Sequence, residues 1–296
     1  MAFVIVTDSA SDFGTTKENE KYHMHIIPTP VTIDGKDYFD GKDLFPDEFY
    51  KLQEEEHDIK TYHVSQYMFH ENFEPYAKRG DEVLYLCFST GIAGTYNAAR
   101  LAYEELQEEY PGFKMTIIDT KCASLGFGLI AYYLLQMQEN GAPNDVLIEA
   151  ASYFSEHMKH IIAVKTLEYL HKGGRMSKTA AVAGTMLDIK PIIRVNEEGA
   201  LEATEKVRGW KKALKREIEI LKEEGADLDH SMIAICHGQI PEDVELSIGW
   251  IREQFPNVKI LQGRIGCAIG AHTGPGIVGI VFQDAHCEKY DKYLNL

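Results

Sequence analysis

Short apolar segments alternate with helical patterns through the first half of the chain. Residues 3–7, 83–88 and 115–118 are rich in β-branched and aromatic residues, which is typical of buried strands. A helix ending at Tyr110 follows the second segment, and the long apolar run 123–138, read as a buried helix, follows the third. This alternation favours a largely parallel sheet that is covered by helices on both faces.

The second half of the chain mixes strands and helices with a hairpin. Residues 189–195 and 201–207 flank the turn sequence NEEG and are predicted to pair with each other. Further strands are predicted at residues 161–164, 232–236 and 258–261, and further helices at residues 210–221 and 241–255. In the first half, residues 26–33 are predicted to be extended, and residues 44–56 and 147–158 are predicted to be helical. We therefore predict an α/β fold with two domains, residues 1–159 and residues 160–296.

Residues 263–283 form a glycine-rich stretch that contains no Asp, Glu, Lys or Arg from position 265 onward. Its five glycines after position 265, together with a proline and a histidine, argue against a membrane span, and the final IVGIVF is typical of a buried strand. The segment AHTGP is predicted to form a tight turn that holds His272 and Thr273. Such a turn suits the binding of a small anionic group, and the alternative is that His272 is a hydrogen-bonded core histidine.

Composition and charge exclude several classes of protein. The net charge is −16, and residues 206–216 are the one short basic segment, which argues against nucleic-acid binding. The N-terminal MAFVIVTDSAS has no basic leader and is predicted to be a strand rather than a signal peptide. Five cysteines without CxxC spacing are interpreted as small core residues in a reducing compartment. We therefore expect a cytoplasmic protein without stable membrane insertion.

The segment STGIAGT does not fit the common cofactor motifs. It matches neither the phosphate loop GxxxxGK[ST] nor the dinucleotide fingerprint GxGxxG, and the catalytic motifs GxSxG and HExxH are absent from the sequence. Six of the twelve histidines are scattered through polar sequence and are expected to be exposed: His57, His63, His70, His157, His160 and His171. We therefore predict no metal and no cofactor.

Small residues and hydroxyls follow several of the predicted strands, where ligands bind in open α/β sheets. Such groups occur at Thr7-Asp8-Ser9, Lys60-Thr61 and Asp119-Thr120, and in the segment STGIAGT, which contains Ser89, Thr90, Gly94 and Thr95. The glycines of this last segment expose backbone N–H groups just before a helix, so it could hold a carboxylate or a phosphate. The alternative is an ordinary helix cap.

Two arginines are the cations that we single out. Arg175 lies in GGRMS and Arg208 in KVRGW, and arginine suits bidentate contacts with carboxylates or phosphates. The alternative for each is a surface charge or an interdomain ion pair, which we favour for Arg208. Ser177, after the Gly-Gly turn, is predicted to cap a helix of small residues.

Taken together, the motifs of this chain resemble those of the DegV family, the fatty-acid-binding subunits of bacterial fatty acid kinases. The resemblance runs over the whole chain and rests on the order and spacing of TDSASDF, KT followed by Ser65 and Phe69, STGIAGTYNAA, DTKCASLGFG, LHKGGRMS, KPII, KVRGWKKAL, CHG and GAHTGPG.

The resemblance implies a Rossmann-like N-terminal domain, a mixed-sheet C-terminal domain and a fatty acid bound between them. It also implies that the carboxylate contacts Thr61, the STGIAGT loop and His272, with Arg175 near that group. Arg208 matches a family arginine that serves kinase docking or lies behind the site. A partner kinase would supply ATP and phosphorylate the carboxylate to an acyl phosphate, so the chain itself would be a carrier rather than an enzyme.

The sequence departs from the family pattern in two places. The family usually has Ser-Gly before Thr-Tyr in the loop, whereas this chain has Ala93-Gly94, so Thr90 or the Gly94 amide must replace the serine hydroxyl. The family's TSQPS is here TYHVS at residues 61–65, which keeps the threonine and the serine but loses the proline.

Two other classes of function remain open on the sequence. One is an enzyme that acts on a small phosphorylated or keto substrate with His272 as acid, base or covalent anchor. The other is a nucleotide-binding regulator, against which the mismatch of STGIAGT with the phosphate-loop and dinucleotide motifs argues.

Overall fold

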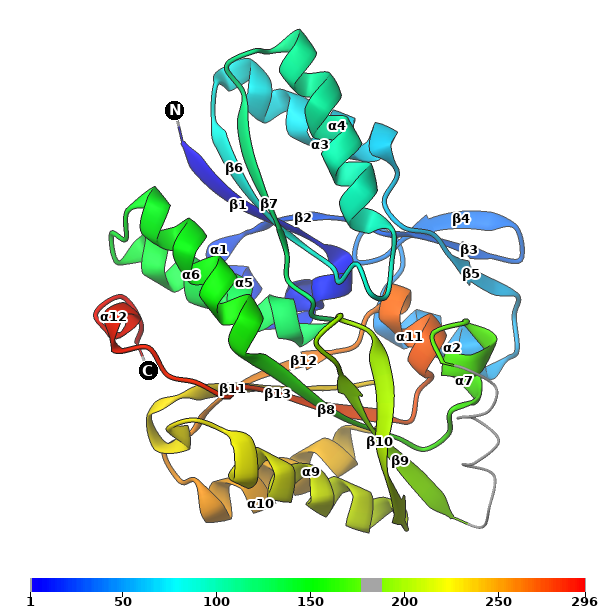
Figure 1. Cartoon of the computed structure of the whole chain (residues 1–296). Coiled ribbons are helices and arrows are strands. Elements are labelled where there is room, and N and C mark those ends of the chain that lie inside the picture. Colours follow the sequence, from blue (N-terminus) through cyan, green and yellow to red (C-terminus); the bar gives the residue numbers. More distant parts are fainter. Residues whose placement is uncertain (1, 177–187, 296) are drawn as a thin grey trace.

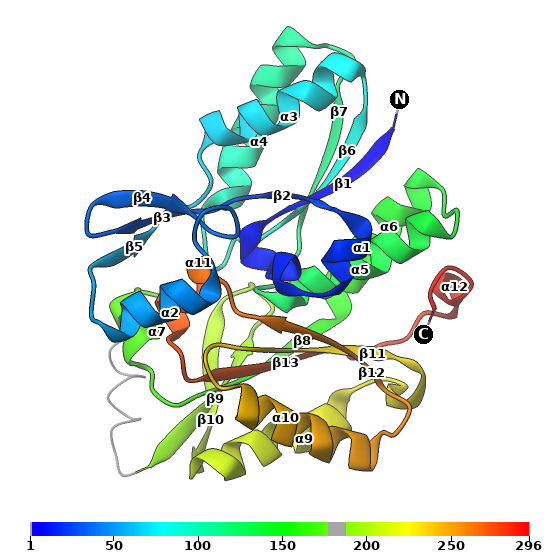
Figure 2. The same ribbon diagram turned by 180° about the vertical axis from the view of Figure 1, so that it is seen from behind.

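The computed structural model describes residues 2–176 and 188–295. Helical layers and sheets alternate from one end of the molecule to the other, as Figures 1 and 2 show from opposite sides. Helices α3 (Gln66–Arg79) and α4 (Thr95–Glu109) form one outer layer, and helices α9 (Trp210–Glu224) and α10 (Pro241–Gln254) form the other. The two larger sheets lie between these layers.

The first sheet is parallel and comes from the N-terminal half. Its strand order is β2 (His25–Ile27), β1 (Phe3–Asp8), β6 (Glu82–Cys87) and β7 (Lys114–Asp119). Parallel pairing of β1 with both β2 and β6 places the carboxyl ends of these strands at one edge. Aromatic side chains of α3 pack on the face opposite α5, where Phe69 and Phe73 contact Tyr85.

The second sheet has six strands of mixed direction. Its order is β10 (Leu201–Arg208), β9 (Ile189–Val195), β8 (Met158–Val164), β13 (Ile277–Gln283), β11 (Met232–His237) and β12 (Lys259–Arg264). The β11–β12 pair is parallel and the other neighbours are antiparallel. The predicted Rossmann-like and mixed-sheet α/β architecture is confirmed by these two sheets.

Helix α5 (Leu125–Glu139) lies between the two sheets and joins them through one apolar core. Twelve of its fifteen residues are buried, as expected for a helix without a polar face. This core combines Leu84 of the first sheet with Met232 and Val281 of the second. Helix α6 (Asn144–His157) packs against α5 on the same layer.

A third, antiparallel sheet lies beside the parallel one and was not predicted. It contains β4 (Lys36–Phe39), β3 (Pro30–Ile33) and β5 (Ile59–Thr61) and packs near α2 (Pro46–Glu54) and α11 (Cys267–Thr273). The remaining short elements are η1 (Ser9–Ser11), η2 (Phe13–Thr15), α1 (Glu18–Tyr22), α7 (Glu168–Lys172), η3 (Leu228–His230) and α12 (Glu288–Asp291).

Most predicted elements agree with the structure, and two details need correction. The hairpin at NEEG and the strand IVGIVF are confirmed. The prediction of a tight turn at AHTGP is wrong, because His272 and Thr273 form the end of helix α11 and the backbone turns at Gly274, where φ is +72°. The helix predicted for residues 147–158 ends at His157, so Met158 begins a strand. Ser177 lies outside the described residues, and the division at residue 159 stays a prediction.

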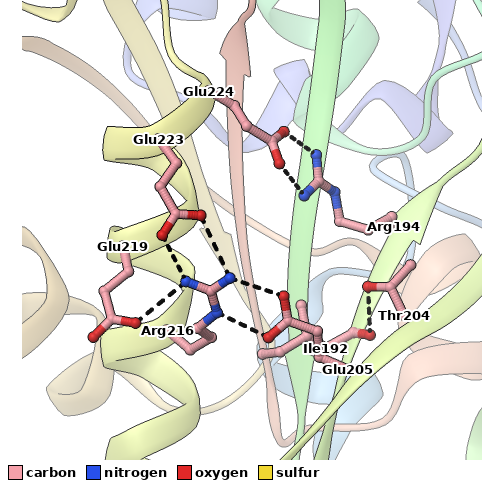
Figure 3. A network of polar contacts seen from close by, with 8 residues as sticks. All are labelled: Ile192, Arg194, Thr204, Glu205, Arg216, Glu219, Glu223 and Glu224. Carbon is pink, nitrogen blue, oxygen red and sulfur yellow. Dashed lines mark hydrogen bonds and ion pairs between the residues drawn. The ribbon is translucent and has the colours of Figure 1, made fainter.

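An ion-pair network braces the outer edge of the second sheet (Figure 3). Arg216 of α9 reaches Glu205 of β10, with its Nε 2.8 Å from Glu205 Oε2, and also pairs with Glu219 and Glu223 of its own helix. Arg194 of β9 pairs with Glu224 at the end of the same helix. Because these side chains connect α9 with β9 and β10, they hold the helix over the hairpin.

Glu217 of α9 is a buried carboxyl whose ionisation affects the stability of the fold. The carboxyl is fully buried; its Oε1 accepts a hydrogen bond from Ala163 N at 2.9 Å, and its Oε2 has no partner among the described residues. Burial raises the pKa of Glu217 well above its ordinary value of 4.5. The folded state therefore keeps a proton that the unfolded state releases, so this group lowers the stability progressively as the pH rises above 4.5.

We predict that Glu217→Gln raises the melting temperature at pH ~8 by a few degrees, because glutamine keeps the acceptor but cannot ionise. The gain should vanish near pH ~4, where the wild-type carboxyl is protonated in both states. Melting curves across this range check the prediction, with the exposed Glu108→Gln as control. A gain that is independent of pH, or a loss at pH ~8, would show that ionisation of Glu217 is not the cause.

Candidate functional site

A cavity of about 230 Å³ lies between the two large sheets. Its walls come from the loops at the carboxyl end of the parallel sheet, from the two residues just before α5, from β8, β9 and β13, and from α11. The apolar lining residues are Ala10, Phe88, Ile92, Ala93, Ala123, Ile162, Leu170, Ile193, Leu201, Ile265, Ala268, Ile269, Ile277 and Val281. Most of the wall is therefore suited to an apolar ligand.

Thr61 and His272 meet at one end of this cavity. Thr61 ends β5 and His272 lies in the last turn of α11, and their side chains are hydrogen-bonded with a distance of 2.7 Å between Thr61 Oγ1 and His272 Nε2. The two residues are 211 positions apart in the chain. Tyr62, which also lines the cavity, is 53% exposed, so this end lies at the surface and is here called the mouth.

Buried carboxyl groups hold helix α11 in place. Asp40 accepts hydrogen bonds from the amides of Cys267 and Ala268 at 2.9 and 3.1 Å, and Asp12 accepts one from Gly266 at 2.8 Å. These contacts satisfy amides at the start of α11 that have no acceptor within the helix. The first turn of α11 is thereby fixed, and with it the position of the imidazole at its far end.

Burial and a neighbouring cation keep His272 neutral. Burial, and to a lesser extent the positive charge of Arg175, lower the pKa of His272 to about 4. Its Nδ1 has no hydrogen-bond partner among residues 2–176 and 188–295 and lies where a Cβ atom on Gly173 would come within 2.1 Å. Arg175 also lines the cavity and donates from Nη1 to the carbonyl of Gly173 at 2.6 Å. A glycine at position 173 is thus required for this arrangement.

The start of helix α4 lies beside the mouth. Gly94 and Thr95 line the cavity, and the ring of His63 is 3.9 Å from the position that a Cβ on Gly94 would occupy. Because Gly94 and Thr95 form the start of α4, its first amides and its partial positive charge lie at this part of the cavity, and no side chain caps them. Thr273 lines the cavity too, but its hydroxyl donates to the carbonyl of Ile269 at 3.2 Å.

Three of the predicted site residues lie outside the cavity lining. Ser89 donates to the carbonyl of Gly199 at 2.7 Å, and Thr90 donates to Asp119 at 2.6 Å, so both hydroxyls tie the loop to neighbouring segments. Arg208 is exposed at the end of β10. Thr61, Gly94, Thr95, Arg175, His272 and Thr273 are the predicted residues that the structure brings to the cavity.

Several polar residues of the wall were not predicted as site residues. The expectation that His160 is exposed is wrong: it is 3% exposed, because it lies in the central strand β8. Ser124 and Cys236 also line the cavity. Asp8, which belongs to the predicted group Thr7-Asp8-Ser9, lines it too, and burial raises its pKa to about 6. For His160 the available signal was the apolar run IIAV that follows it directly.

Gly91 connects the loop at the mouth with the β9–β10 hairpin. A Cβ at this position would lie 2.5 Å from Gly199 C and 2.6 Å from Glu198 O, which are backbone atoms that cannot rotate away. We predict that Gly91→Ala lowers the stability by about 1–3 kcal/mol, as overpacking does. Thermal or urea unfolding checks this, with Gly94→Ala as control because its Cβ would meet no atom closer than 3.9 Å. Equal stability of the two variants would refute the contact.

Residues 2–176 and 188–295 contain no cluster of three or more histidine, cysteine or carboxylate side chains that could hold a metal ion. In the same part of the chain, no helix combines the length and apolar character needed to cross a membrane.

Comparison with known proteins gives consistent matches over nearly the whole chain. A family model described as an uncharacterised protein of the DegV family matches residues 2–285. A DegV domain-containing protein of Clostridium perfringens is 38% identical over 284 residues, which cover 95% of this chain and 97% of the relative.

Solved structures show the same fold. A DegV family protein from Thermus thermophilus, described as binding fatty acid, matches with a TM-score of 0.84 and 26% identity over 96% of this chain and 100% of that chain. A stearic-acid-binding protein from Eubacterium ventriosum matches with a TM-score of 0.83 and 27% identity, covering 98% of this chain and 99% of that chain.

Proposed function

Because the chain belongs to the DegV family, we propose that its cavity binds one long-chain fatty acid and presents the carboxylate at the mouth to a partner kinase. The acyl chain would lie between the two sheets, and the carboxylate would lie beside Thr61 and His272. The observation that carries the proposal is the hydrogen-bonded Thr61–His272 pair at the surface end of a largely apolar cavity.

The apolar wall supplies most of the binding free energy in this proposal. Burial of each CH₂ group of a ligand contributes about 0.8 kcal/mol. Residues from both sheets, such as Phe88 and Ile277, would surround the chain and remove it from water. The affinity should therefore increase with chain length until the cavity is filled.

The groups at the mouth are suited to a carboxylate. When His272 Nε2 carries the proton, it donates to Thr61 Oγ1, and the Thr61 hydroxyl is then free to donate to the ligand. The amides at the start of α4, near Gly94 and Thr95, supply further donors and a partial positive charge. Half-buried Arg175 adds a cation nearby, so the desolvation of the carboxylate is offset. Hydroxyls of Ser89 and Thr90 are not part of this set.

A partner kinase would bring ATP and Mg²⁺ to the exposed mouth and form an acyl phosphate. This step rests on the resemblance of the motifs to fatty acid kinase subunits, and the present chain acts as carrier in it. Exposed Arg208 at the end of β10 would belong to the docking surface rather than to the cavity. Acyl phosphate should form from kinase, ATP and fatty acid when the carrier is added, and Arg208→Glu should slow this reaction without changing fatty acid affinity.

A series of saturated fatty acids tests the binding itself. Delipidated protein is titrated with acids of increasing length, and the dissociation constant should fall about fourfold for each added CH₂ until the cavity is full. The methyl ester of the tightest acid should bind more weakly, because it cannot accept the hydrogen bonds of a carboxylate. Affinities that do not depend on chain length would contradict the proposal, as would partner-free turnover of a small phosphorylated or keto substrate that His272→Ala abolishes.

A further inference from the structure

Three polar side chains interrupt the apolar wall deep in the cavity, and we call them the inner polar patch: Ser124, His160 and Cys236. Each lines the cavity and is at least nine-tenths buried, with exposures of 7%, 3% and 3%. Ser124 Oγ is 3.5 Å from Cys236 Sγ. His160 Nε2 lies 3.3 Å from the amide and 3.2 Å from the carbonyl of Ala123, the residue before Ser124.

The register of β13 places the inner polar patch away from the mouth. Ile277, Gly279 and Val281 of this strand all line the cavity, and Ile277 lies nearest to the end of α11 in the chain. Gly279 is paired with Cys236, and Val281 with His160. At a rise of about 3.4 Å per residue, these levels lie about 7 and 14 Å beyond Ile277. The patch therefore borders the middle and inner part of a bound acyl chain.

The inner polar patch retains unused hydrogen-bonding capacity. Ser124 donates its hydroxyl hydrogen to Asp12, which leaves the oxygen free to accept. The acceptors near the Cys236 thiol are Ser124 Oγ at 3.5 Å and Gly279 O at 3.7 Å, both long contacts, and burial raises the pKa of this thiol to about 12, so it keeps its proton. His160 Nδ1 finds no partner among the described residues. One site thus offers both a donor and acceptors.

The backbone conformation of Ser124 is unusual. Its φ of +52° and ψ of −140° are rare for a residue other than glycine, and although it precedes α5 its side chain forms no cap hydrogen bond. The hydroxyl is instead held by Asp12 against the cavity wall. A wall that served alkyl chains alone would gain by replacing these polar groups with apolar ones of similar size.

Building on the proposed function, we propose that the inner polar patch binds a hydroxyl group carried in the middle of the acyl chain, so that hydroxylated long-chain fatty acids are ligands of this protein. The ligand hydroxyl would donate to Ser124 Oγ or to a ring nitrogen of His160 and accept from the Cys236 thiol. In a cavity without such partners, burial of the hydroxyl would weaken binding by about tenfold or more.

Titration of delipidated protein with stearic acid and with a series of its mid-chain hydroxy derivatives tests this inference. In the wild type, at least one positional isomer should bind as tightly as stearic acid or more tightly. Ser124→Ala and Cys236→Ala should each weaken binding of that isomer about fivefold to tenfold, while stearic acid changes less than about twofold. Cys236→Ser should retain binding of the isomer, because it keeps a donor at the same place.

A matched control and three distinct contradicting outcomes complete the test. Val281→Ala removes apolar wall at the same depth and should weaken stearic acid and its hydroxy derivatives alike. Binding of stearic acid with about tenfold or greater rejection of every isomer would overturn this inference and leave the proposed function standing. Equal effects of Ser124→Ala and Cys236→Ala on both ligands would overturn it as well, whereas failure of stearic acid and all isomers to bind would overturn both proposals. Melting curves establish that each variant is folded.

Discussion

Replacing Gly279 by leucine is expected to weaken the binding of long-chain fatty acids by about fiftyfold or more while the protein stays folded. Gly279 lies in the middle of β13, between Ile277 and Val281, and all three residues line the cavity. Since alternate residues of a strand face the same side, a side chain at position 279 enters the cavity between the other two.

The size of this effect follows from the apolar surface that the leucine would displace. If the ligand can no longer bury about three CH₂ groups at ~0.8 kcal/mol each, it loses about 2.4 kcal/mol, or about fiftyfold in the dissociation constant. A Cβ at position 279 would lie 3.1 Å from Cys236 Sγ and 3.9 Å from Ile162, so the thiol has to move by a few tenths of an ångström. Folding should therefore survive the substitution.

Titration with palmitic and octanoic acids measures the effect, and octanoic acid should lose much less affinity because it reaches less far past Ile277. Gly249→Leu is the matched control, since a Cβ there meets no atom within 4 Å and the residue lies on α10, outside the cavity lining. Unchanged palmitic acid binding by folded Gly279→Leu would mean that the acyl chain does not occupy this cavity.

Substitutions at the mouth should instead separate phosphorylation from binding. Thr61→Ala and His272→Ala remove the side chains that would orient the carboxylate, and misplacing a reacting group by about 1 Å can cost about 10²-fold in rate. The affinity for the fatty acid should fall by less than about tenfold, because the buried acyl chain supplies most of the binding free energy. Kinase-dependent formation of acyl phosphate should therefore fall far more than fatty acid affinity.

Paired measurements on the same protein samples check this division. The dissociation constant of palmitic acid and the rate of acyl phosphate formation are compared for both variants and for Thr61→Ser, which keeps the hydroxyl and should retain most of the rate. The acyl chain is proposed to supply the affinity, and the mouth to orient the carboxylate for phosphorylation. Equal losses of affinity and of rate in Thr61→Ala and His272→Ala would refute this assignment.

The sequence predicted the two large sheets but not the elements that shape the mouth. Helix α3 contains Pro75 in its interior, which argues against a helix in a pattern-based prediction. Strands β4 and β5 have only four and three residues, too few for a clear alternation of buried and exposed positions. Tertiary contacts with α2 and α11 stabilise them, and these contacts are formed by residues distant in sequence.

The prediction for AHTGP failed for a related reason. Glycines indicated a turn, yet residues 267–273 form a helix because Asp12 and Asp40 satisfy the amides at its start from more than 200 positions away. Likewise, no local pattern pairs Thr61 with His272; their joint role came from the resemblance to a family, and the structure places their side chains in contact.

His160 shows why the polar residues inside the cavity could not be predicted from the sequence. Its neighbours Lys159 and His157 are polar, so the surrounding sequence indicated an exposed position. The strand β8 is nevertheless central in its sheet, with β9 on one side and β13 on the other, and this buries the imidazole against α5. Which polar residues face a cavity depends on sheet order, which a single sequence does not contain.

Native mass spectrometry of the purified protein tests most directly whether the cavity is a fatty acid site. The proposal predicts one bound fatty acid per chain, or uptake of one equivalent when palmitic or oleic acid is added to delipidated protein, and a much smaller bound fraction in Gly279→Leu at the same concentrations. Folded wild-type protein that carries no lipid and takes up neither acid would contradict it.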